Sequence, residues 1–167
     1  YTTQAAIADL IDNSISAGAR TIQLEMHGSG RDSWIRITDD GGGMTEERLV
    51  EAMRAGSQSP REARDKDDLG RFGLGLKTAS FSQARELTVV SRRDGQTAKR
   101  RWDLDVVEES NEWRLLRTIS DAQESLVNLD SEASGTLVLL QRLDRVVGDV
   151  EVDDENARRR FQHLVEQ

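Results

Sequence analysis

Residues 39–44 read DDGGGM, and this short segment connects a strand pattern to a helix pattern through three successive glycines. The apolar run before it, residues 34–38, is typical of a strand. After it, Thr45 is a good N-cap for a helix over residues 46–55. Glycine permits backbone conformations and close approaches that other residues forbid. The segment is therefore either a plain strand-to-helix turn or a site where the backbone approaches a ligand and the Asp39 carboxylate accepts a hydrogen bond from a ligand amine.

A second glycine-rich segment, GRFGLGLKT, occupies residues 70–78 and leads into a helical pattern over Leu74–Ala84. Backbone amides in such a loop bind phosphate oxygens together with the positive end of a helix, and Lys77 can add a point charge. The spacing differs from the P-loop, and the segment lacks the strand that precedes a dinucleotide-binding fingerprint. By itself the segment indicates an anion-binding loop or an ordinary turn.

Towards the N-terminus, residues 3–17 read as a helix with two unlike faces. Its apolar side chains and Ser14 fall on one side, whereas Asp9 and Asn13 lie one turn apart on the other. Asp and Asn are poor residues for the middle of a helix, and a solvated face usually prefers Glu, Lys and Gln. The pattern therefore indicates either an amphipathic helix with a wet face or a short carboxylate and amide that hold a metal or a water near the backbone.

The remaining segments place most strands in the second half of the chain. Apolar alternation predicts strands over residues 21–27, 86–93, 99–107, 112–119 and 136–141. Residues 28–32 and Asp94-Gly95 read as hairpin turns, and residues 152–165 as a last helix. Because the helices cluster early and do not alternate with the strands, the order predicts an α+β fold. It places helices on one face of a mixed, mainly antiparallel sheet.

The composition is that of one globular domain over residues 1–167, with 32% charged and 36% hydrophobic residues. The absence of cysteine excludes disulfides and thiolate metal sites. The net charge of −8 argues against a domain that binds duplex nucleic acid over its whole surface. No apolar run approaches the roughly 20 residues that span a bilayer, so we expect no membrane partner and a cytoplasmic location, or a nuclear one in a eukaryote. The chain begins without Met, and we expect it to be a fragment of a longer chain.

Taken in order, four segments resemble the motifs of the GHKL superfamily, the ATPases related to gyrase B, Hsp90, histidine kinases and MutL. They are an N-box at residues 8–19, a D-x-G-x-G box at 39–44, a second glycine box at 70–78 and a Gly-Thr element at 135–136. The amino-acid sequence of the second glycine box is most similar to that of the MORC-like and MutL-like branch. The resemblance implies the Bergerat ATP-binding fold, a two-layer α/β sandwich.

The same resemblance implies ATP and Mg²⁺ as cofactors, with Asn13 as the metal ligand. Asp39 would accept a hydrogen bond from the adenine amino group, supported by Thr136. Residues 56–71 are long and polar, and they would close over the nucleotide as a lid. The other implied nucleotide contacts are Gly41, Gly43, Met44, Gly70, Gly73, Leu74, Gly75, Leu76, Lys77 and Thr78.

The catalytic candidates are Asp9 and Lys77, and Asp9 departs from the family pattern. Hydrolysing members usually carry Glu at this position, where it orients and deprotonates the attacking water. Asp is one methylene shorter, which sets its carboxylate back by about 1.5 Å. An error of about 1 Å in catalytic positioning can cost on the order of 100-fold in rate. We therefore expect Mg²⁺-dependent ATP binding with slow hydrolysis that drives a conformational switch.

Two alternatives stay open at this point, a histidine kinase catalytic domain and a nucleotide-binding module that does not hydrolyse. Only His27 and His163 are present, and neither lies in a recognisable phosphoacceptor helix. The resemblance also allows a nucleotide-dependent homodimer and a protein or nucleic-acid partner bound through further domains. The identity of such a partner does not follow from the fold.

Overall fold

The computed structural model describes residues 2–54, 72–119, 121–129 and 133–143, which build one five-stranded sheet with helices packed on it. The strands are β1 Ile22–His27, β2 Trp34–Asp39, β3 Glu86–Arg93, β4 Gln96–Asp103 and β5 Gly135–Gln141. The helices are α1 Thr3–Ser16, α2 Glu46–Arg54, α3 Phe72–Phe81, α4 Leu104–Ser110 and α5 Asp121–Glu124, with a 3-10 turn at Gly30–Asp32.

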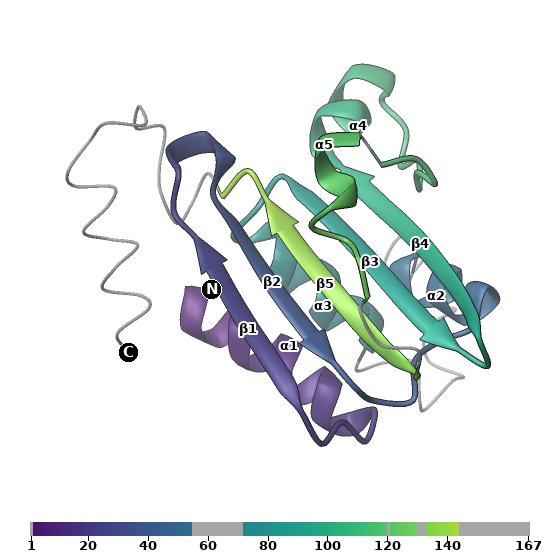
Figure 1. The fold of residues 1–167 in the computed structure, drawn as a ribbon. Coiled ribbons are helices and arrows are strands. Elements are labelled where there is room, and N and C mark those ends of the chain that lie inside the picture. Colours follow the sequence, from purple (N-terminus) through teal and green to yellow (C-terminus); the bar gives the residue numbers. More distant parts are fainter. Residues whose placement is uncertain (1, 55–71, 120, 130–132, 144–167) are drawn as a thin grey trace.

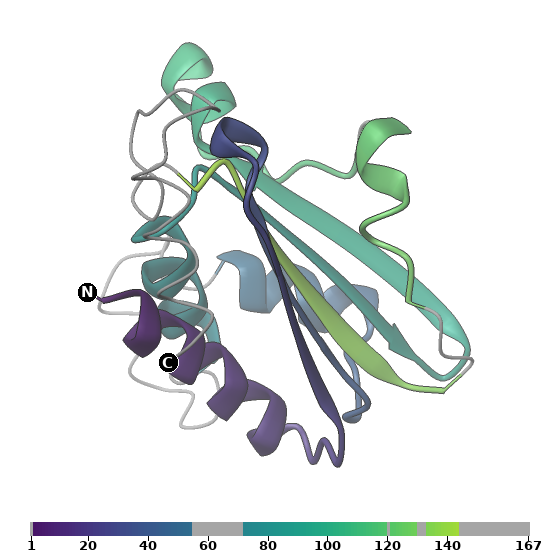
Figure 2. The same cartoon turned by 60° about the vertical axis from the view of Figure 1, so that its left-hand side comes forward.

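The sheet has the order β1-β2-β5-β3-β4, and each of these neighbouring pairs is antiparallel. The helices α1, α2 and α3 lie together on one face of this sheet (Figures 1 and 2). The predicted α+β class and its helical layer are confirmed. Among the described strands there is no parallel pair, so the sheet there is antiparallel rather than mixed. None of the helices in the described ranges is long and apolar enough to cross a membrane.

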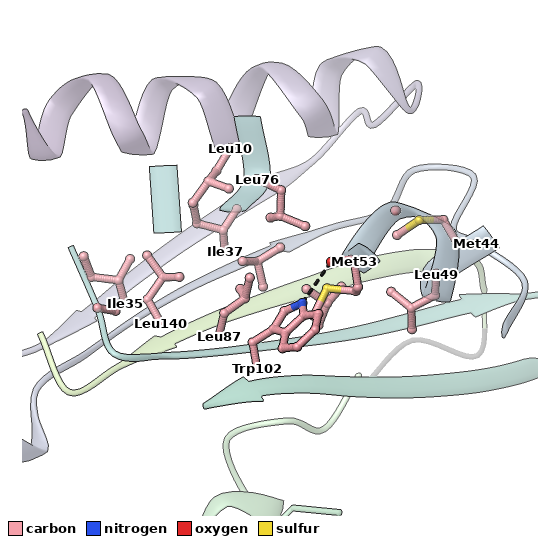
Figure 3. Packing of buried hydrophobic residues seen from close by; sticks show 14 of the residues in the cluster. Leu10, Ile35, Ile37, Met44, Leu49, Met53, Leu76, Leu87, Trp102 and Leu140 are labelled. Atoms are coloured by element: carbon pink, nitrogen blue, oxygen red, sulfur yellow. Dashed lines mark hydrogen bonds between the residues drawn. The ribbon is translucent and has the colours of Figure 1, made fainter. Parts of the chain in front are cut away.

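The main core lies between the sheet and these three helices. Alternate residues of the strands point to the helices, as the pleat requires, so that Ile37 of β2 and Val89 of β3 flank Val138 of β5. Leu10 of α1 and Leu76 of α3 pack against this layer, as the close view of the core shows (Figure 3). The core therefore joins α1, α3 and the central strands into one body.

The buried Trp102 ties the edge of the sheet to α2. Its ring is 1% exposed, and its indole N–H donates to the backbone carbonyl of Met53 at 2.9 Å (Figure 3). Tryptophan buried in a core needs such a partner for its N–H group. Because Met53 lies in the last turn of α2, this bond holds the end of that helix against β4.

The opposite face of the sheet is also covered in part, by side chains that include Ile119, Leu126 and Leu129. Val90 of β3 and Leu137 and Leu139 of β5 form a second apolar cluster there with Val127. The central strand β5 is thus buried on both faces, which explains its nearly continuous apolar run.

Two predicted strands were wrong in part. The strand predicted over residues 99–107 ends at Asp103, because the Asp103 carboxylate accepts from the Asp105 N–H at 2.9 Å and caps α4. Residues 112–119 do not form a strand, and Arg101 and Leu116 make a single isolated bridge. The predicted lid over residues 56–71 and the predicted helix over residues 152–165 lie outside the described residues.

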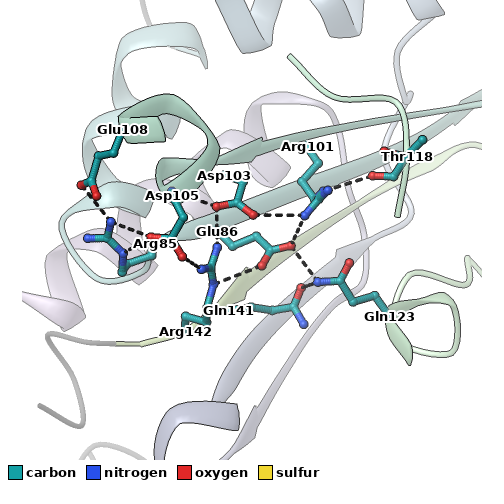
Figure 4. A network of polar contacts seen from close by, with 10 residues as sticks. All are labelled: Arg85, Glu86, Arg101, Asp103, Asp105, Glu108, Thr118, Gln123, Gln141 and Arg142. Atoms are coloured by element: carbon teal, nitrogen blue, oxygen red, sulfur yellow. Dashed lines mark hydrogen bonds and ion pairs between the residues drawn. The ribbon is translucent and has the colours of Figure 1, made fainter. Parts of the chain in front are cut away.

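A network of ion pairs closes the end of the sheet that lies near α4 and α5 (Figure 4). Its centre is Glu86, whose side chain is only 6% exposed. Glu86 pairs with Arg101 at 2.9 Å and with Arg142 at 3.3 Å, and it accepts from the Gln123 amide at 2.7 Å. These contacts connect β3, β4, α5 and the residue that follows β5. A buried carboxylate with this many donors keeps its charge satisfied.

We expect Glu86→Ala to lower the free energy of unfolding by about 3 kcal/mol, because Arg101 and Arg142 keep Asp103 but lose the more deeply buried carboxylate that they share. Glu112→Ala is the matched control, since Glu112 pairs with Arg114 and both side chains are more than 60% exposed. That variant should lose less than about 1 kcal/mol. Urea unfolding of both variants measures the difference. Equal losses would show that the network adds no more stability than a surface pair.

Candidate functional site

Three polar side chains from adjacent strands meet on the helix-covered face of the sheet. Asp39 ends β2, Thr136 is the second residue of β5 beside it, and Ser91 lies in β3 on the other side of Thr136. All three residues are buried. Because a buried polar group costs free energy unless it is hydrogen-bonded, each of these side chains needs a partner within the protein.

Asp39 receives three hydrogen bonds that fix the orientation of its carboxylate. Oδ1 accepts from the backbone N–H of Gly41 at 2.9 Å and from that of Thr136 at 3.2 Å. Oδ2 accepts from the Ser14 hydroxyl of α1 at 2.7 Å. An ionised carboxylate offers roughly four acceptor positions. Two are used on Oδ1 and one on Oδ2, so the position that stays open belongs to Oδ2.

Ser91 anchors the segment that follows β2 to the neighbouring strands. Its hydroxyl oxygen accepts from the Met44 N–H at 2.8 Å and lies 2.8 Å from the Thr136 hydroxyl. It also lies within donating distance of the Gly135 carbonyl, at 3.2 Å. Ser91 therefore joins Met44, β3 and the start of β5 around the Asp39 carboxylate.

Two of the three glycines in residues 39–44, Gly41 and Gly43, lie in close packing within the protein. Gly43 has φ +66°, and a Cβ there would lie 1.9 Å from the carbonyl oxygen of Arg92. A Cβ on Gly41 would lie 3.0 Å from the Ala17 Cβ and 3.1 Å from Asp39 Oδ1. Across the strands, a Cβ on Gly135 would lie 2.3 Å from the Asp39 carbonyl oxygen. These small residues let the chain turn tightly between α1 and the ends of β3 and β5.

Asp40 has a different role from its neighbour Asp39. Its Oδ1 accepts from the N–H groups of Thr21 at 2.8 Å and Arg20 at 2.7 Å. These backbone hydrogen bonds, the one from Thr21 first, hold the pKa of the exposed Asp40 carboxyl below its usual value. Asp40 thus fastens the start of β1 to the end of β2.

A small cavity of about 40 Å³ lies beside Asp39, between α1, α3 and the sheet. It is larger than the space that one water needs, which is roughly 10–15 Å³. The lining residues are Leu10, Asn13, Ser14, Ala17, Asp39, Gly43, Met44, Leu76, Thr136 and Val138. The Asn13 side-chain nitrogen is buried here without a hydrogen-bond partner in the described part of the chain. The cavity therefore combines apolar walls with an open carboxylate position and an unpartnered amide.

Lys77 takes up a position apart from this cavity. Its Nζ lies 4.7 Å from the ring centre of Trp102 and 5.4 Å from that of Trp113. The side chain is half-buried, and burial lowers the pKa of its amine to about 8. The ammonium is therefore held by aromatic faces in this structure.

The structure brings together many of the residues predicted from the sequence. Asn13, Asp39, Gly43, Met44, Leu76 and Thr136 line the cavity, and Gly41 binds Asp39 through its N–H. Asp9, Lys77 and Thr78 are not among the lining residues, although Asp9 lies one turn from Asn13 on α1. Gly73, Leu74 and Gly75 belong to the first turn of α3. Gly70 lies outside the described residues.

Two contributors to this site were not identified from the sequence. Ser14 was assigned to the apolar side of its helix, yet its hydroxyl binds Asp39. The signal was a polar residue at a position where the helical pattern calls for an apolar one. Ser91 stands among valine and arginine in a predicted strand, and no local pattern shows that it binds Met44, which precedes it by 47 residues.

Comparisons with known proteins show the family to which this fold belongs. Residues 1–136 match the family model described as histidine kinase-, DNA gyrase B-, and HSP90-like ATPase. The chain is 34% identical over 90 residues to ATPase morc-1 of Caenorhabditis elegans, a match that covers 54% of this chain and 10% of that protein. It is 36% identical over 95 residues to the DNA mismatch repair protein MutL of Haemophilus influenzae, covering 54% of this chain and 15% of MutL. The chain thus spans a small part of the length of these relatives.

Two solved structures share the fold. One is the N-terminal domain of a DNA repair protein, with a TM-score of 0.51 and 18% identity over 96% of this chain and 40% of that chain. The other is the 43K ATPase domain of Thermus thermophilus gyrase B in complex with an aminocoumarin, with a TM-score of 0.52 and 15% identity over 92% of this chain and 37% of that chain. At these identities the similarity shows the fold alone.

We expect Gly43→Ala to cost about 4 kcal/mol or more of unfolding free energy, because the new methyl group meets the Arg92 carbonyl as well as an unfavourable φ. Gly18→Ala is the control. Gly18 has φ +77°, and a Cβ there would meet nothing within 4 Å. Gly18→Ala should therefore lower the free energy of unfolding by about 1–2 kcal/mol, the cost of the left-handed backbone conformation alone. Thermal and urea unfolding compare them, and similar losses would contradict the packing explanation.

Proposed function

The chain belongs to the histidine kinase-, DNA gyrase B- and HSP90-like ATPase family, and we propose that it binds ATP with Mg²⁺, hydrolyses it slowly and uses the nucleotide as a conformational switch. The observation that carries the proposal is the buried Asp39 carboxylate, which keeps one acceptor position open beside a cavity. The family supports ATP binding in general. The hydrolysis, the metal and the switch are our proposal for this chain.

Asp39 provides the chemistry for recognising adenine. The exocyclic amine of adenine is a donor, and Oδ2 is the oxygen of Asp39 with an open acceptor position. The same group in guanine is a carbonyl, which would meet the carboxylate acceptor to acceptor. A site whose buried polar group is left unpaired by the wrong ligand discriminates strongly. The apolar walls from Leu10, Met44 and Val138 suit a flat aromatic base.

Asn13 is the residue that would hold Mg²⁺. Its buried amide has an unpartnered end at the cavity, and rotation of the amide by 180° exchanges its oxygen and nitrogen. Within the described ranges no group of three or more His, Asp and Glu side chains gathers to enclose a metal. This suits Mg²⁺, which is usually held by one or two protein oxygens together with phosphate and water. When bound, the ion would screen the charge of the phosphates.

The first turn of α3 is the part of the fold suited to phosphate. The first N–H groups of a helix have no partner within the helix, and they carry its positive end. In α3 this turn includes Gly73 and Gly75. Leu76, in the next turn, already lines the Asp39 cavity, so the helix start lies at the same site. Lys77 would add a charge to these phosphates.

A bound nucleotide would link α1, α3 and the end of the sheet. Leu10 and Leu76, one from each helix, line the cavity with Asp39 and Thr136. A ligand that contacts all of these elements favours whichever arrangement of the helices suits it best. A homodimer or a protein or nucleic-acid partner would then respond to that arrangement.

Asp9 decides between hydrolysis and a second candidate function, binding without turnover. It lies one turn before Asn13 on the same helix. A general base must reach a water in line with the terminal phosphate. Because Asp is shorter than the Glu usual at this position, the carboxylate would act from a greater distance, and slow turnover follows.

We expect Asp39→Asn to weaken ATP binding by about 100-fold while the protein stays folded. The N–H groups of Gly41 and Thr136 require an acceptor at Oδ1, so the amide would place its NH₂ at the Oδ2 position. There it would meet the adenine amine donor to donor. Calorimetric titration with ATP and GTP measures this effect.

Asp40→Asn is the matched control for that experiment. Its amide oxygen can still accept from the N–H groups of Arg20 and Thr21. ATP affinity should therefore change by less than about threefold, since the hydrogen bonds that Asp40 accepts lie outside the cavity beside Asp39. If GTP binds the unmodified protein as well as ATP does, or if both Asp variants lose affinity equally, the adenine role of Asp39 is wrong.

We expect Asp9→Asn to abolish phosphate release and to leave ATP affinity within a few-fold, because it removes the base but keeps size and polarity. Asp9→Glu should retain or raise turnover. Asp12→Asn, at an exposed position of the same helix, is the control and should leave turnover unchanged. Steady-state phosphate release, with a melting curve for each variant, gives the answer.

The outcomes of that experiment separate the alternatives. No release by the unmodified protein, together with unchanged ATP, would indicate a module that binds without turnover. Labelled phosphate retained on the protein would indicate a histidine kinase. Loss of nucleotide binding in Asp9→Asn would contradict the role of a general base and would indicate a metal-binding or folding role.

A further inference from the structure

The Lys77 ammonium lies in a corner formed by two tryptophan rings. Its Nζ is 4.7 Å from the centre of Trp102 and 5.4 Å from the centre of Trp113. The two rings meet edge to face, with centres 5.4 Å apart and planes at 81°. A cation within about 6 Å of a ring centre is attracted by the negative charge over the ring face. The amine is therefore held by both rings at once.

The two walls of this corner differ in how firmly they are fixed. Trp102 is 1% exposed and donates to the Met53 carbonyl, so its ring is immobilised in the core. Trp113 is 56% exposed, and its other aromatic contact is Phe81 of α3 at 6.2 Å. It belongs to the stretch after α4 that does not form a strand. Trp113 is thus an exposed side chain that covers a half-buried amine.

The charge of Lys77 is only partly satisfied in this corner. Burial alone lowers the pKa of the amine to about 8, and no described carboxylate offsets that effect. Ring faces attract a cation less strongly than an anion does when both are sheltered from water. A phosphate group near the start of α3 would therefore compete well for this ammonium.

The helix allows the amine to make that exchange without movement of the backbone. Side chains on a helix lean towards its N-terminus, and Lys77 lies in the second turn of α3, after the glycines of the first. Its four methylene groups give the amine a reach of about 6 Å. Leu76, the preceding residue, lines the Asp39 cavity. The amine can therefore turn from the tryptophan corner to the start of its own helix.

We propose that Trp102 and Trp113 form a resting site for the Lys77 ammonium, which leaves it to bind the phosphates of a nucleotide, and that Trp113 is a positioning residue that limits how available Lys77 is. The inference rests on the proposed function, since it needs phosphates at the start of α3. When only a fraction of the protein has its amine free, the apparent affinity falls by that fraction. Weakening the resting site should therefore strengthen binding of phosphate-bearing nucleotides.

The exchange can be followed on the lysine itself. The chain has three lysines, at positions 66, 77 and 99. With ¹³C-labelled lysine, the εCH₂ signal of Lys77 should be displaced by the ring currents of the two indoles in the free protein, and Lys77→Arg assigns it. Adding ATP with Mg²⁺ should move this signal to the ordinary lysine position. Adenosine, which carries no phosphate, should leave it displaced.

Variants of Trp113, the exposed tryptophan, test how the resting site affects the affinity for ATP. Trp113→Leu should remove the displacement and tighten ATP binding about three- to tenfold, with adenosine affinity unchanged. Trp113→Phe keeps a ring and should give an intermediate result. In a Lys77→Met background, Trp113→Leu should have no effect on ATP affinity. Trp34→Leu is the matched control, because Trp34 also holds a cation, Arg36 at 5.4 Å, on the opposite face of the sheet.

The outcomes distinguish this inference from the proposed function. If neither ATP nor ADP binds the unmodified protein, the proposed function is wrong. The movement of the Lys77 ammonium to the phosphates is then wrong as well. If ATP binds while the Lys77 signal stays displaced, or if Trp113→Leu weakens ATP binding, only the exchange is wrong. A tryptophan corner with a merely structural role would change ATP and adenosine affinities together, and that result would also overturn the proposal. Melting curves show whether each variant is folded.

Discussion

The arrangement of this protein around its candidate site depends on the three hydrogen bonds to the Asp39 carboxylate. They come from Ser14 in α1, Gly41 in the following turn and Thr136 at the start of β5. One buried anion therefore fixes a helix, a turn and a strand relative to one another. The same bonds leave one acceptor position of the carboxylate open, and Asp39 lines the cavity. In the proposed function, structure and ligand binding use different lone pairs of this one side chain.

Close packing of the backbone follows from this interaction. For Asp39 to lie beside Thr136, the chain must pass within contact of Gly135, where a side chain would meet the Asp39 carbonyl. Gly43 then passes against the Arg92 carbonyl, and Ser91 binds Met44. The glycines thus serve the fold before they serve any ligand. Near α4 and α5 the sheet has different stabilising groups, since ion pairs around Glu86 connect the strands there.

Local patterns predicted the elements better than their ends and pairings. The helix over residues 3–17 and the strands that contain Ile37, Val89 and Val138 were found from apolar spacing, because each buries one face or both. The segment 99–107 has the same alternation but becomes a helix after Asp103, where a capping bond competes with the sheet. Residues 112–119 alternate as well, yet their side chains serve other contacts, among them Trp113 over Lys77.

The sequence alone determined the α+β class, the order of the motifs and the choice of Asn13 and Asp39 as candidate site residues. Spacing and residue type are enough for these because they reflect local chemistry. Only the tertiary structure decided which groups complete the site. Ser14 and Ser91 lie far from Asp39 and Met44 along the chain, and no periodicity relates them. Contacts of this kind arise when strands and helices pack, since packing brings together residues that have no local relation in sequence.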